Sequence, residues 1–397
     1  MGEAELFGPP AACFTSSEWY DRDLQVMFRP RWQLAAHSSE LREPGTLMRF
    51  TSGPDEAVVV RARDGRLRGY RNFCRHRGHR LCPADSAQVR QHLVCSYHGW
   101  SYSVEDGSLQ TAPRMHEGFD HEPWALREVW VEEHRDLVFV AFGPERPPAV
   151  ADLLATSEPD DDPSFDALGG YDFGRMKVAG RSSWEVEANW KLAVENNLEC
   201  YHCRLNHPEL CRVIDPWALP TRYGSDDSAP TIAEIRALAA KEVRRSREFD
   251  ARFSFDGAPA CARPLPRIDD RPGPTLFMHI APYNVIAPTA DYVWTWAVDP
   301  LAADRSRVRH MFLVHEDAED GVDYDTETLV GFWNTVMAQD EPLCSEMQCG
   351  IAQPTYTPGP LNKVHQMFPA GFYLWYQDTM HDHGYDATYA ERVPEVA

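Results

Sequence analysis

The chain has 397 residues, a formal net charge of −22 and ten cysteines. This acidic balance argues against a nucleic-acid partner and favours either cationic ligands or simply a soluble surface. With no apolar run of eighteen residues and no charged-then-apolar N-terminus, the sequence predicts neither a membrane span nor a signal peptide. Ten cysteines in a chain of this length do not resemble a secreted disulfide scaffold, so we expect a reducing, cytoplasmic setting.

In chain order, the sequence predicts a lead-in segment over residues 1–44, followed by a small β-rich domain over residues 45–150. The β-rich runs are short and are separated by turn signals, which is typical of an antiparallel β domain that presents two loops at one tip. Its first predicted elements are a strand over 57–62, a tight turn at Asp64-Gly65 and a strand over 67–73. Residues 144–165 are rich in proline and acidic residues and predict a linker.

The second domain, residues 151–397, mixes strand-like and helical patterns. Apolar residues at helical spacing predict a long helix over 325–350 with one buried face. The other predicted elements are strands over 176–186, 275–280, 292–298 and 308–315, and helices over 190–203 and 231–247. The fold class is therefore α+β, with an antiparallel sheet that grips a long helix.

The most specific motif is Cys74-x-His76, then eighteen residues, then Cys95-x-x-His98. Two thiolates on one iron and two imidazoles on the other form a Rieske two-iron, two-sulfur centre, in which the neutral imidazoles raise the reduction potential. A tetrahedral zinc site is the alternative, because zinc also takes cysteine and histidine ligands. Zinc sites usually use two cysteines separated by two residues, and the pattern here therefore favours the iron–sulfur cluster.

A second cluster lies in Glu199-Cys-Tyr-His202-Cys-Arg-Leu-Asn-His207. Two imidazoles with one remote carboxylate leave one side of a metal ion open, which suits non-haem ferrous iron that must bind dioxygen beside a substrate. A histidine pair at this spacing is by itself more often structural than metal-binding. The upstream motif strengthens the interpretation as an iron site.

Together with Asn189-Trp190-Lys191, these two motifs resemble the catalytic α subunit of the Rieske non-haem iron oxygenases, and the resemblance covers nearly the whole chain. The family resemblance implies a helix-grip, START-like catalytic domain, a [2Fe–2S] cluster, a mononuclear Fe(II) ion, and electrons from a separate flavin- and ferredoxin-type NAD(P)H reductase. The details around Glu199 and Asn206-His207-Pro208 are similar to the branch that oxidises quaternary ammonium compounds, such as glycine betaine, stachydrine, choline or carnitine.

The family resemblance also implies the third iron ligand and a role for Glu199. It places the ligand on the late helix, before Glu346-x-Gln348, which corresponds to Asp340, with the adjacent Glu341 as rival. Pro342 is expected to disturb the helix just after this ligand. In the family a carboxylate at the position of Glu199 joins the iron site of one subunit to the Rieske histidine of the next. Glu199 would thus contact His202 and the neighbour's His98, within a head-to-tail homotrimer.

Three cysteines, Cys200, Cys203 and Cys211, flank the expected iron ligands. The spacing of Cys200 and Cys203 can indicate a zinc site or a redox pair. Cysteines beside a helical ligand more often pack as small apolar groups, and this is the interpretation that we favour.

A quaternary ammonium ion cannot donate a strong hydrogen bond, and we therefore expect an aromatic cage around it. Alternation places Tyr292, Trp294 and Trp296 on one face of a strand. Further candidates from the C-terminal part of the chain are Phe372, Tyr373, Trp375 and Tyr376. For any one of these residues, a place in the ordinary core is the alternative.

The sequence leaves three alternative functions open. The first is an oxygenase with the same two centres that acts on an arene or natural product. The second is an electron-transfer ferredoxin, which would lack His202, His207 and Asp340. The third is a zinc-stabilised binding protein. The sequence does not identify the substrate, the atom hydroxylated, the choice between mono- and dioxygenation, or the reductase.

Overall fold

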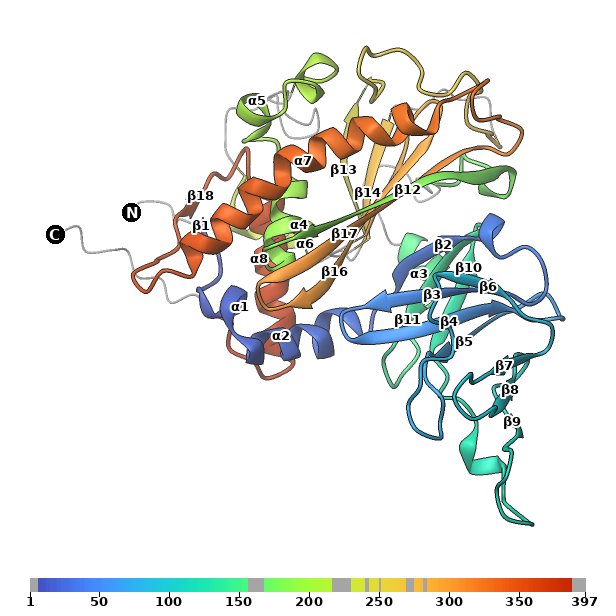
Figure 1. Cartoon of the computed structure of the whole chain (residues 1–397). Coiled ribbons are helices and arrows are strands. Elements are labelled where there is room, and N and C mark those ends of the chain that lie inside the picture. Colours follow the sequence, from blue (N-terminus) through green and yellow to red (C-terminus); the bar gives the residue numbers. More distant parts are fainter. Residues whose placement is uncertain are drawn as a thin grey trace. The chain divides into compact units, whose positions relative to one another are not determined.

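The structure is a computed structural model that describes residues 6–155, 168–215, 230–239, 243–249, 251–268, 275–280 and 284–387. The chain forms two compact units (Figure 1). The larger unit contains residues 1–27, 152–172 and 179–397, and the smaller unit contains residues 28–151 and 173–178. Residues 28–44, from the predicted lead-in, thus lie in the same unit as the small β domain. The predicted linker over 144–165 falls partly outside the described residues.

The smaller unit consists of three antiparallel sheets. The first sheet has the order β10 (Trp130–His134), β11 (Leu137–Ala141), β2 (Gln33–His37). The second has the order β5 (Leu67–Arg71), β4 (Asp55–Arg61), β3 (Thr46–Ser52), β6 (Ser86–Gln88). The third has the order β7 (His92–Val94), β8 (Ser101–Ser103), β9 (Leu109–Thr111).

Strand β4 is apolar on both of its faces because each face packs into a different hydrophobic cluster. Ala57 and Val59 belong to a cluster with residues of β2 and β11. Val58 and Val60 point the other way and pack with Cys74, Cys95 and the aromatic residues around them. Successive strand residues face opposite sides of a sheet, so the uninterrupted run Ala57–Val60 identifies a strand buried on both sides. The residues Val58 and Val60 of β4 thus pack against both loops that carry Cys74 and Cys95.

The larger unit contains a six-stranded sheet, and every pairing with a described register is antiparallel. Its order is β12 (Met176–Val186), β17 (Arg305–His315), β16 (Val293–Ala302), β15 (Asn284–Pro288), β14 (Thr275–Ile280), β13 (Val243–Phe249). A two-stranded sheet pairs β1 (Leu6–Phe7) with β18 (Pro360–Leu361). Its described α-helices are α1 (Ala12–Thr15), α2 (Ser17–Asp23), α4 (Trp190–Leu198), α5 (Cys203–Asn206), α6 (Ile232–Ala239), α7 (Thr326–Ile351) and α8 (Met367–Asp382). In the sequence, the division between the units falls within α3 (Val150–Ala155), after Ala151. This architecture confirms the predicted α+β class.

Helix α7 crosses the sheet of the larger unit (Figure 1) and matches the predicted long helix. Asp325 caps its N-terminus by accepting a 2.8 Å hydrogen bond from the Thr328 backbone N–H. Its buried residues recur every three or four positions, from Leu329 through Trp333 and Asp340 to Ile351. The helix continues through Pro342, so the proline does not end it, although Pro342 has no N–H to donate to the preceding turn. Asp340 therefore lies on the buried stripe.

Two predicted helices end earlier than expected. The helix predicted over 190–203 ends at Leu198, because Glu199 is extended and its carboxylate accepts a hydrogen bond from the Tyr201 backbone N–H. Such local side-chain bonding competes with the helix. The helix predicted over 231–247 is wrong from Val243 onward, because 243–249 instead forms the edge strand β13 against β14, and residues 240–242 lie outside the described residues. Pairing with a neighbouring strand overrides the helical preference of this segment.

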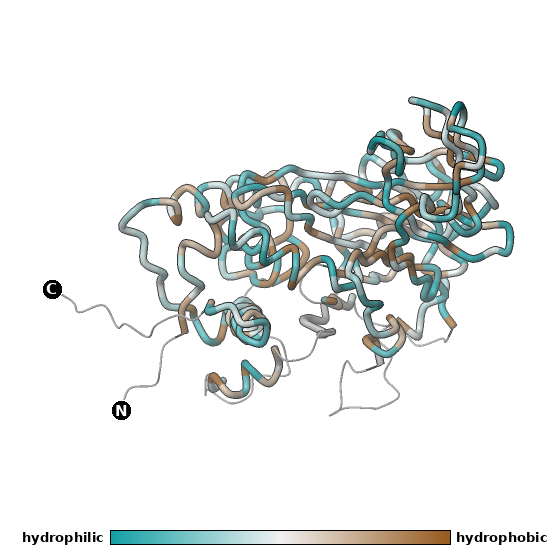
Figure 2. The backbone as a smooth tube through the Cα atoms, turned by 90° about the horizontal axis from the view of Figure 1, so that it is seen from below, coloured by the Kyte–Doolittle hydropathy of each residue, from teal (hydrophilic) through white to brown (hydrophobic). Residues whose placement is uncertain are grey.

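Among the described residues, no helix has both the length and the apolarity that crossing a membrane requires. Figure 2 shows the same property along the backbone, where apolar stretches are short and interrupted by polar ones.

A buried ion pair explains the motif Asn189-Trp190-Lys191. Asn189 caps α4 by accepting a 3.0 Å hydrogen bond from the Lys191 backbone N–H. The Trp190 indole donates to Asp23 Oδ2 at 2.8 Å, and the Lys191 ammonium group pairs with the same carboxylate. The Tyr376 hydroxyl donates to Asp23 Oδ1 at 2.7 Å. Helices α2, α4 and α8 are thus joined around one fully buried carboxylate.

Replacing Lys191 with methionine is expected to lower the free energy of unfolding by about 3–5 kcal/mol, because Asp23 would remain buried without its cation. The measurement is the shift in urea unfolding followed by tryptophan fluorescence. The control is the double variant Lys191→Met/Asp23→Asn, which removes both charges and should recover part of the loss. Equal losses in the single and double variants would contradict this explanation.

Candidate metal centres

Two loops of matching geometry bring Cys74, His76, Cys95 and His98 together in the smaller unit. In the first loop the Cys74 N–H donates to His79 O, and the Gly78 N–H donates back to Cys74 O. In the second loop the Cys95 N–H donates to Trp100 O, and the Gly99 N–H donates back to Cys95 O. Gly78 and Gly99 have φ values of 75° and 74°, a conformation that favours glycine. The strand β7 ends directly before Cys95, which fixes the start of the second loop.

Within this pair of loops, the cysteines are buried and the histidines are exposed. The rings of His76 and His98 lie with centroids 4.8 Å apart, and His76 also stacks on Trp100. The Tyr102 hydroxyl accepts a hydrogen bond from the Arg75 N–H and contacts Cys74 Sγ at 3.1 Å, so its own proton is free to point at the sulfur. A donor aimed at a cluster thiolate stabilises negative charge and raises the reduction potential. The donor set fits a Rieske cluster whose histidine side faces outward.

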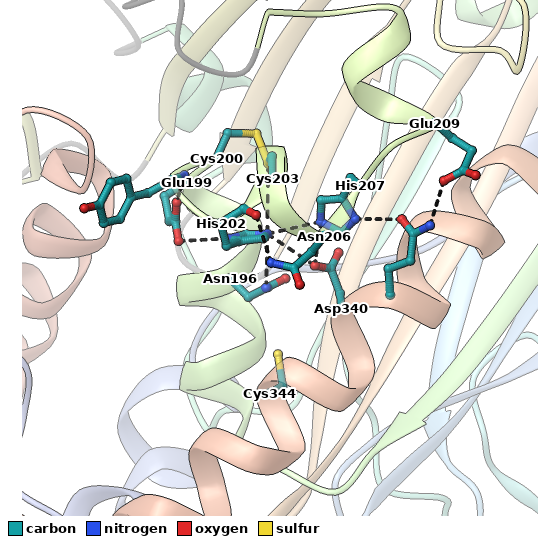
Figure 3. A network of polar contacts seen from close by, with 12 residues as sticks. Asn196, Glu199, Cys200, His202, Cys203, Asn206, His207, Glu209, Asp340 and Cys344 are labelled. Carbon is teal, nitrogen blue, oxygen red and sulfur yellow. Dashed lines mark hydrogen bonds and ion pairs between the residues drawn. A yellow bond between two sulfur atoms is a disulfide. The ribbon is translucent and has the colours of Figure 1, made fainter.

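In the larger unit, α5 and α7 bring together the side chains of His202, His207 and Asp340 (Figure 3). His202 Nε2 lies 3.2 Å from His207 Nε2, and Asp340 Oδ1 lies 3.3 Å and 3.0 Å from these two nitrogens. Adjacent ligands at right angles around a metal ion, with bonds of about 2.1 Å, would lie about 3 Å apart. The spacing therefore matches one face of a two-histidine, one-carboxylate metal site.

The hydrogen bonds that the Nδ1 atoms of His202 and His207 make determine which nitrogen atom of each ring faces Asp340. His202 Nδ1 lies 2.9 Å from Glu199 Oε1, a carboxylate oxygen that can only accept. His207 Nδ1 lies 2.8 Å from Gln339 Oε1, and Gln339 Nε2 donates to Glu209 Oε2 at 2.7 Å, which orients the amide. Both Nδ1 atoms therefore donate, and the lone pairs of both Nε2 atoms face Asp340.

The three converging acceptors require a positive charge between them. No described residue donates a hydrogen bond to Asp340 Oδ1, which is buried. Burial would lower the pKa of His202, but the contacts with Asp340 and Glu199 outweigh it and raise the pKa to about 9. A proton or a metal ion satisfies this need, and the donor set suits ferrous iron. Asn196 Nδ2 lies 3.4 Å from His202 Nε2, at the edge of the same site.

Replacing Gln339 with leucine is expected to weaken iron binding by about 10- to 100-fold, the usual effect of losing a partner behind a ligand histidine. The variant leaves His207 Nδ1 without its acceptor and frees the ring to turn. The measurement is iron retained after dialysis against a graded chelator. The matched control is Gln339→Glu, which keeps an acceptor for His207 and should bind iron more tightly than the leucine variant.

A cavity opens beside His202, His207 and Asp340, and aromatic side chains form much of its wall. Trp294 and Trp333 stack there with ring centroids 3.9 Å apart and planes inclined by 6°. Polar residues of α4 and the turn after it, Asn196, Asn197 and Glu199, also line the cavity. The remaining apolar lining residues are Leu198, Leu210, Ile214, Phe253, Phe277 and Val336.

Of the seven aromatic residues predicted for substrate, only Trp294 lines this cavity. Tyr292 does not line the cavity. Its hydroxyl donates to Phe253 O and accepts a 2.9 Å hydrogen bond from Trp333 Nε1. Trp296 and Trp375 are buried and line neither this cavity nor the one at Tyr373.

Tyr373 lies on α8 at a separate cavity, where its hydroxyl bonds the carboxyl of Glu195. Burial raises the pKa of Glu195 to about 7. The other two sequence candidates on this helix, Phe372 and Tyr376, are core residues, because Phe372 packs on Trp190 and Tyr376 bonds Asp23.

Trp333 belongs to the apolar pattern that predicted the long helix over 325–350, and neither Trp333 nor Gln339 was predicted for this site. Trp333 lies seven residues before Asp340, two turns away on the same face of α7. That spacing was available in the sequence and marks Trp333 as a neighbour of the proposed ligand.

Both units match known families. Residues 31–131 match the Rieske [2Fe-2S] domain, and residues 173–382 match the catalytic domain of the ring hydroxylating alpha subunits. The chain belongs to the Rieske non-haem iron oxygenase α subunits, which hold a [2Fe–2S] cluster and a mononuclear iron and take electrons from a separate reductase.

The similarity to known proteins extends over nearly the whole chain. The glycine betaine monooxygenase oxygenase subunit of Pseudomonas aeruginosa is 30% identical over 392 residues, covering 94% of this chain and 89% of the relative. That of Chromohalobacter salexigens is 31% identical over 388 residues, covering 94% and 85%. The solved quaternary ammonium Rieske monooxygenase CntA with L-carnitine has a TM-score of 0.71 at 19% identity, covering 95% and 96%, a likeness that describes the fold.

Proposed function

We propose that this protein is the terminal oxygenase of a monooxygenase that hydroxylates or N-demethylates a betaine-like quaternary ammonium compound. The full-length similarity to glycine betaine monooxygenase oxygenase subunits supports this assignment. The observation that carries it is the stacked pair Trp294 and Trp333 at the cavity beside His202, His207 and Asp340. An indole ring attracts an ammonium ion that has no proton to donate.

The proposed roles follow from these contacts. His202, His207 and Asp340 would hold Fe(II), which supplies dioxygen activation when it is bound. Glu199 and Gln339 hold the two imidazoles in the orientation that such binding needs. In the other unit, the ligands of the cluster would be Cys74, His76, Cys95 and His98. The aromatic wall would position the N-methyl groups.

The test is turnover by purified, iron-replete protein with a working reductase and a panel of quaternary amines that includes glycine betaine and carnitine. Formaldehyde release with matching dioxygen uptake is the expected result. The rival function is oxidation of a neutral arene, in keeping with the similarity to a biphenyl 2,3-dioxygenase subunit over 46% of this chain. Arene oxidation without turnover of any amine would overturn the proposal.

Replacing Trp333 with leucine is expected to raise the KM for the cationic substrate by about 5- to 30-fold, corresponding to about 1–2 kcal/mol of cation–π attraction. The comparison ligand is the uncharged isostere in which carbon replaces the quaternary nitrogen. Its inhibition constant should change much less, because it has the same shape without the charge. Equal changes for the two ligands would assign Trp333 a purely steric role.

We also propose a head-to-tail trimer in which electrons reach this iron site from a neighbour's cluster. A solved quaternary ammonium Rieske monooxygenase that oxidises carnitine transfers electrons between subunits. Close to Glu199 in sequence, Tyr201 is 52% exposed and Leu205 is 88% exposed. Large side chains this exposed in the same segment as a buried carboxylate suit a surface that another subunit covers.

A further inference from the structure

The proposed iron chemistry makes no use of the two cysteines on either side of His202. Cys200 and Cys203 form a disulfide, with Cα atoms 4.8 Å apart (Figure 3). Cys203 is buried and is the first residue of α5, whereas Cys200 is partly exposed in the turn before it. A disulfide this close to a metal ligand changes which atoms can bind the metal.

The sulfur of Cys203 lies within reach of the metal site. Its Sγ is 4.0 Å from His202 Nε2. The donor atoms of His202, Cys203 and His207 all lie within 4.8 Å of one another, so this trio also satisfies the spacing of a metal site. Asp340 approaches the two Nε2 atoms more closely. The centre thus contains two overlapping ligand sets, one completed by a carboxylate and the other by a sulfur.

The two sets differ in the metals that they favour. A thiolate with two imidazoles suits zinc, whereas two imidazoles with a carboxylate suit ferrous iron that must keep open positions. Zinc also stands above iron in the general order of affinity. A sulfur in a disulfide cannot become a thiolate, and the S–S bond therefore removes the second set while leaving the first intact.

We propose that the Cys200–Cys203 pair controls the metal selectivity of this centre. In the reduced form, Cys203 is a sulfur ligand that completes a His–Cys–His site for thiophilic divalent ions such as Zn²⁺ or Co²⁺. In the oxidised form, the site offers only His202, His207 and Asp340. The inference concerns metal binding and stands independently of which substrate the enzyme oxidises.

The redox step balances with a peroxide as oxidant. Hydrogen peroxide takes two electrons and two protons from the Cys200 and Cys203 thiols. The two S–H bonds and the O–O bond break, one S–S bond forms, and two molecules of water leave. A small-molecule dithiol reverses the step through thiol–disulfide exchange.

The test uses the full-length protein with its [2Fe–2S] cluster, the mononuclear iron removed by a chelator, and Co²⁺ as probe. Thiolate bound to Co²⁺ gives an intense near-ultraviolet charge-transfer band, read as the difference before and after cobalt so that cluster absorption cancels. The dithiol-treated protein is expected to show the band, and the peroxide-treated protein is expected to lack it. Differential alkylation with mass spectrometry reports the redox state of Cys200 and Cys203 in the same samples.

Two variants, each of which removes the disulfide, show which of the two cysteines binds the metal. Cys200→Ser keeps the Cys203 thiol and should show the band after either treatment. Cys203→Ser should lose it after both treatments. Cys211→Ser is the control for the third nearby sulfur, which bonds Cys203 O, and should behave like the unaltered protein.

Three results would overturn the proposal. The first is no band in the reduced protein or in Cys200→Ser, both loaded with cobalt. The second is a band that persists in Cys203→Ser, which would assign the sulfur to another residue. The third is alkylation showing that peroxide leaves both thiols free. None of these results depends on turnover, so they remain informative if no quaternary amine proves to be a substrate.

Discussion

Replacing Asp340 with asparagine is expected to lower turnover by more than about 100-fold. Removing a residue that only supports a metal ligand already costs up to about 100-fold, and the loss of a ligand itself should cost more. Asp340 Oδ1 is the buried atom that faces both Nε2 nitrogens, at 3.3 Å and 3.0 Å. A neutral amide removes the negative charge that favours a cation there. The measurement is iron per chain beyond that of the cluster, together with product formed per minute.

The matched control for this prediction is Glu341→Gln. Glu341 is adjacent in sequence, but its carboxylate accepts a 2.7 Å hydrogen bond from Ser345 and is not part of the triad. Its variant should keep the mononuclear iron. In both variants the Rieske spectrum should be unchanged, because its proposed ligands lie in the other unit. Iron loss in Glu341→Gln with retention in Asp340→Asn would reverse the assignment.

Subunit mixing extends the Asp340 prediction to the proposed trimer. Asp340→Asn keeps a working cluster, and Cys95→Ser is expected to lose the cluster but keep the iron site. If electrons cross between subunits, mixed trimers of these two inactive variants should regain measurable turnover. Activity that stays absent in verified mixed trimers would argue for electron transfer within one subunit.

Replacing Glu199 with glutamine is expected to reduce turnover by about 10- to 100-fold while most of the iron is retained. Glu199 accepts hydrogen bonds from both His202 Nδ1 and the Tyr201 N–H. A glutamine has one acceptor oxygen for these two donors, so the His202 ring loses its fixed orientation. The proposed contact with a neighbouring subunit's histidine would also be weakened. The measurement is the rate of cluster reoxidation in a single turnover with substrate and dioxygen.

The control for Glu199 is Glu195→Gln, one helical turn earlier. Glu195 bonds Tyr373 at a different cavity and does not contact His202. If the loss of any carboxyl group near α4 were enough, both variants would slow reoxidation equally. Slower reoxidation in Glu199→Gln alone supports a specific role for its carboxylate.

The two loops that carry the proposed cluster ligands could be predicted because their geometry is local. Cys74 and Gly78, like Cys95 and Gly99, are close in sequence, and each pair closes its own loop with backbone hydrogen bonds. The spacing of these residues in the sequence is therefore enough to predict the two loops. The pairing of His202 with His207 was predictable for the same reason. The link to Asp340 came from family resemblance, because more than a hundred residues separate it from His207 and no spacing rule spans that distance.

Several elements depended on tertiary contacts that periodicity does not record. The strand β13 forms where a polar helical pattern was expected, because β14 offers an unpaired edge. Helix α4 ends at Leu198 because the Glu199 side chain bonds the backbone after it. The aromatic residues of α8 looked like cage candidates, but the helix places them around Asp23 and Glu195.

The sequence by itself determined the two metal motifs, the α+β class, the long helix α7 and the family, because each rests on short-range spacing or on a specific set of motifs. Only the tertiary structure decided which aromatic rings line the cavity beside His202, His207 and Asp340. Strand alternation assigned Tyr292, Trp294 and Trp296 to one face, yet only Trp294 lines the cavity, where Trp333 of α7 meets it. A strand pattern gives the direction of a side chain, whereas a cavity wall depends on which other element packs against it.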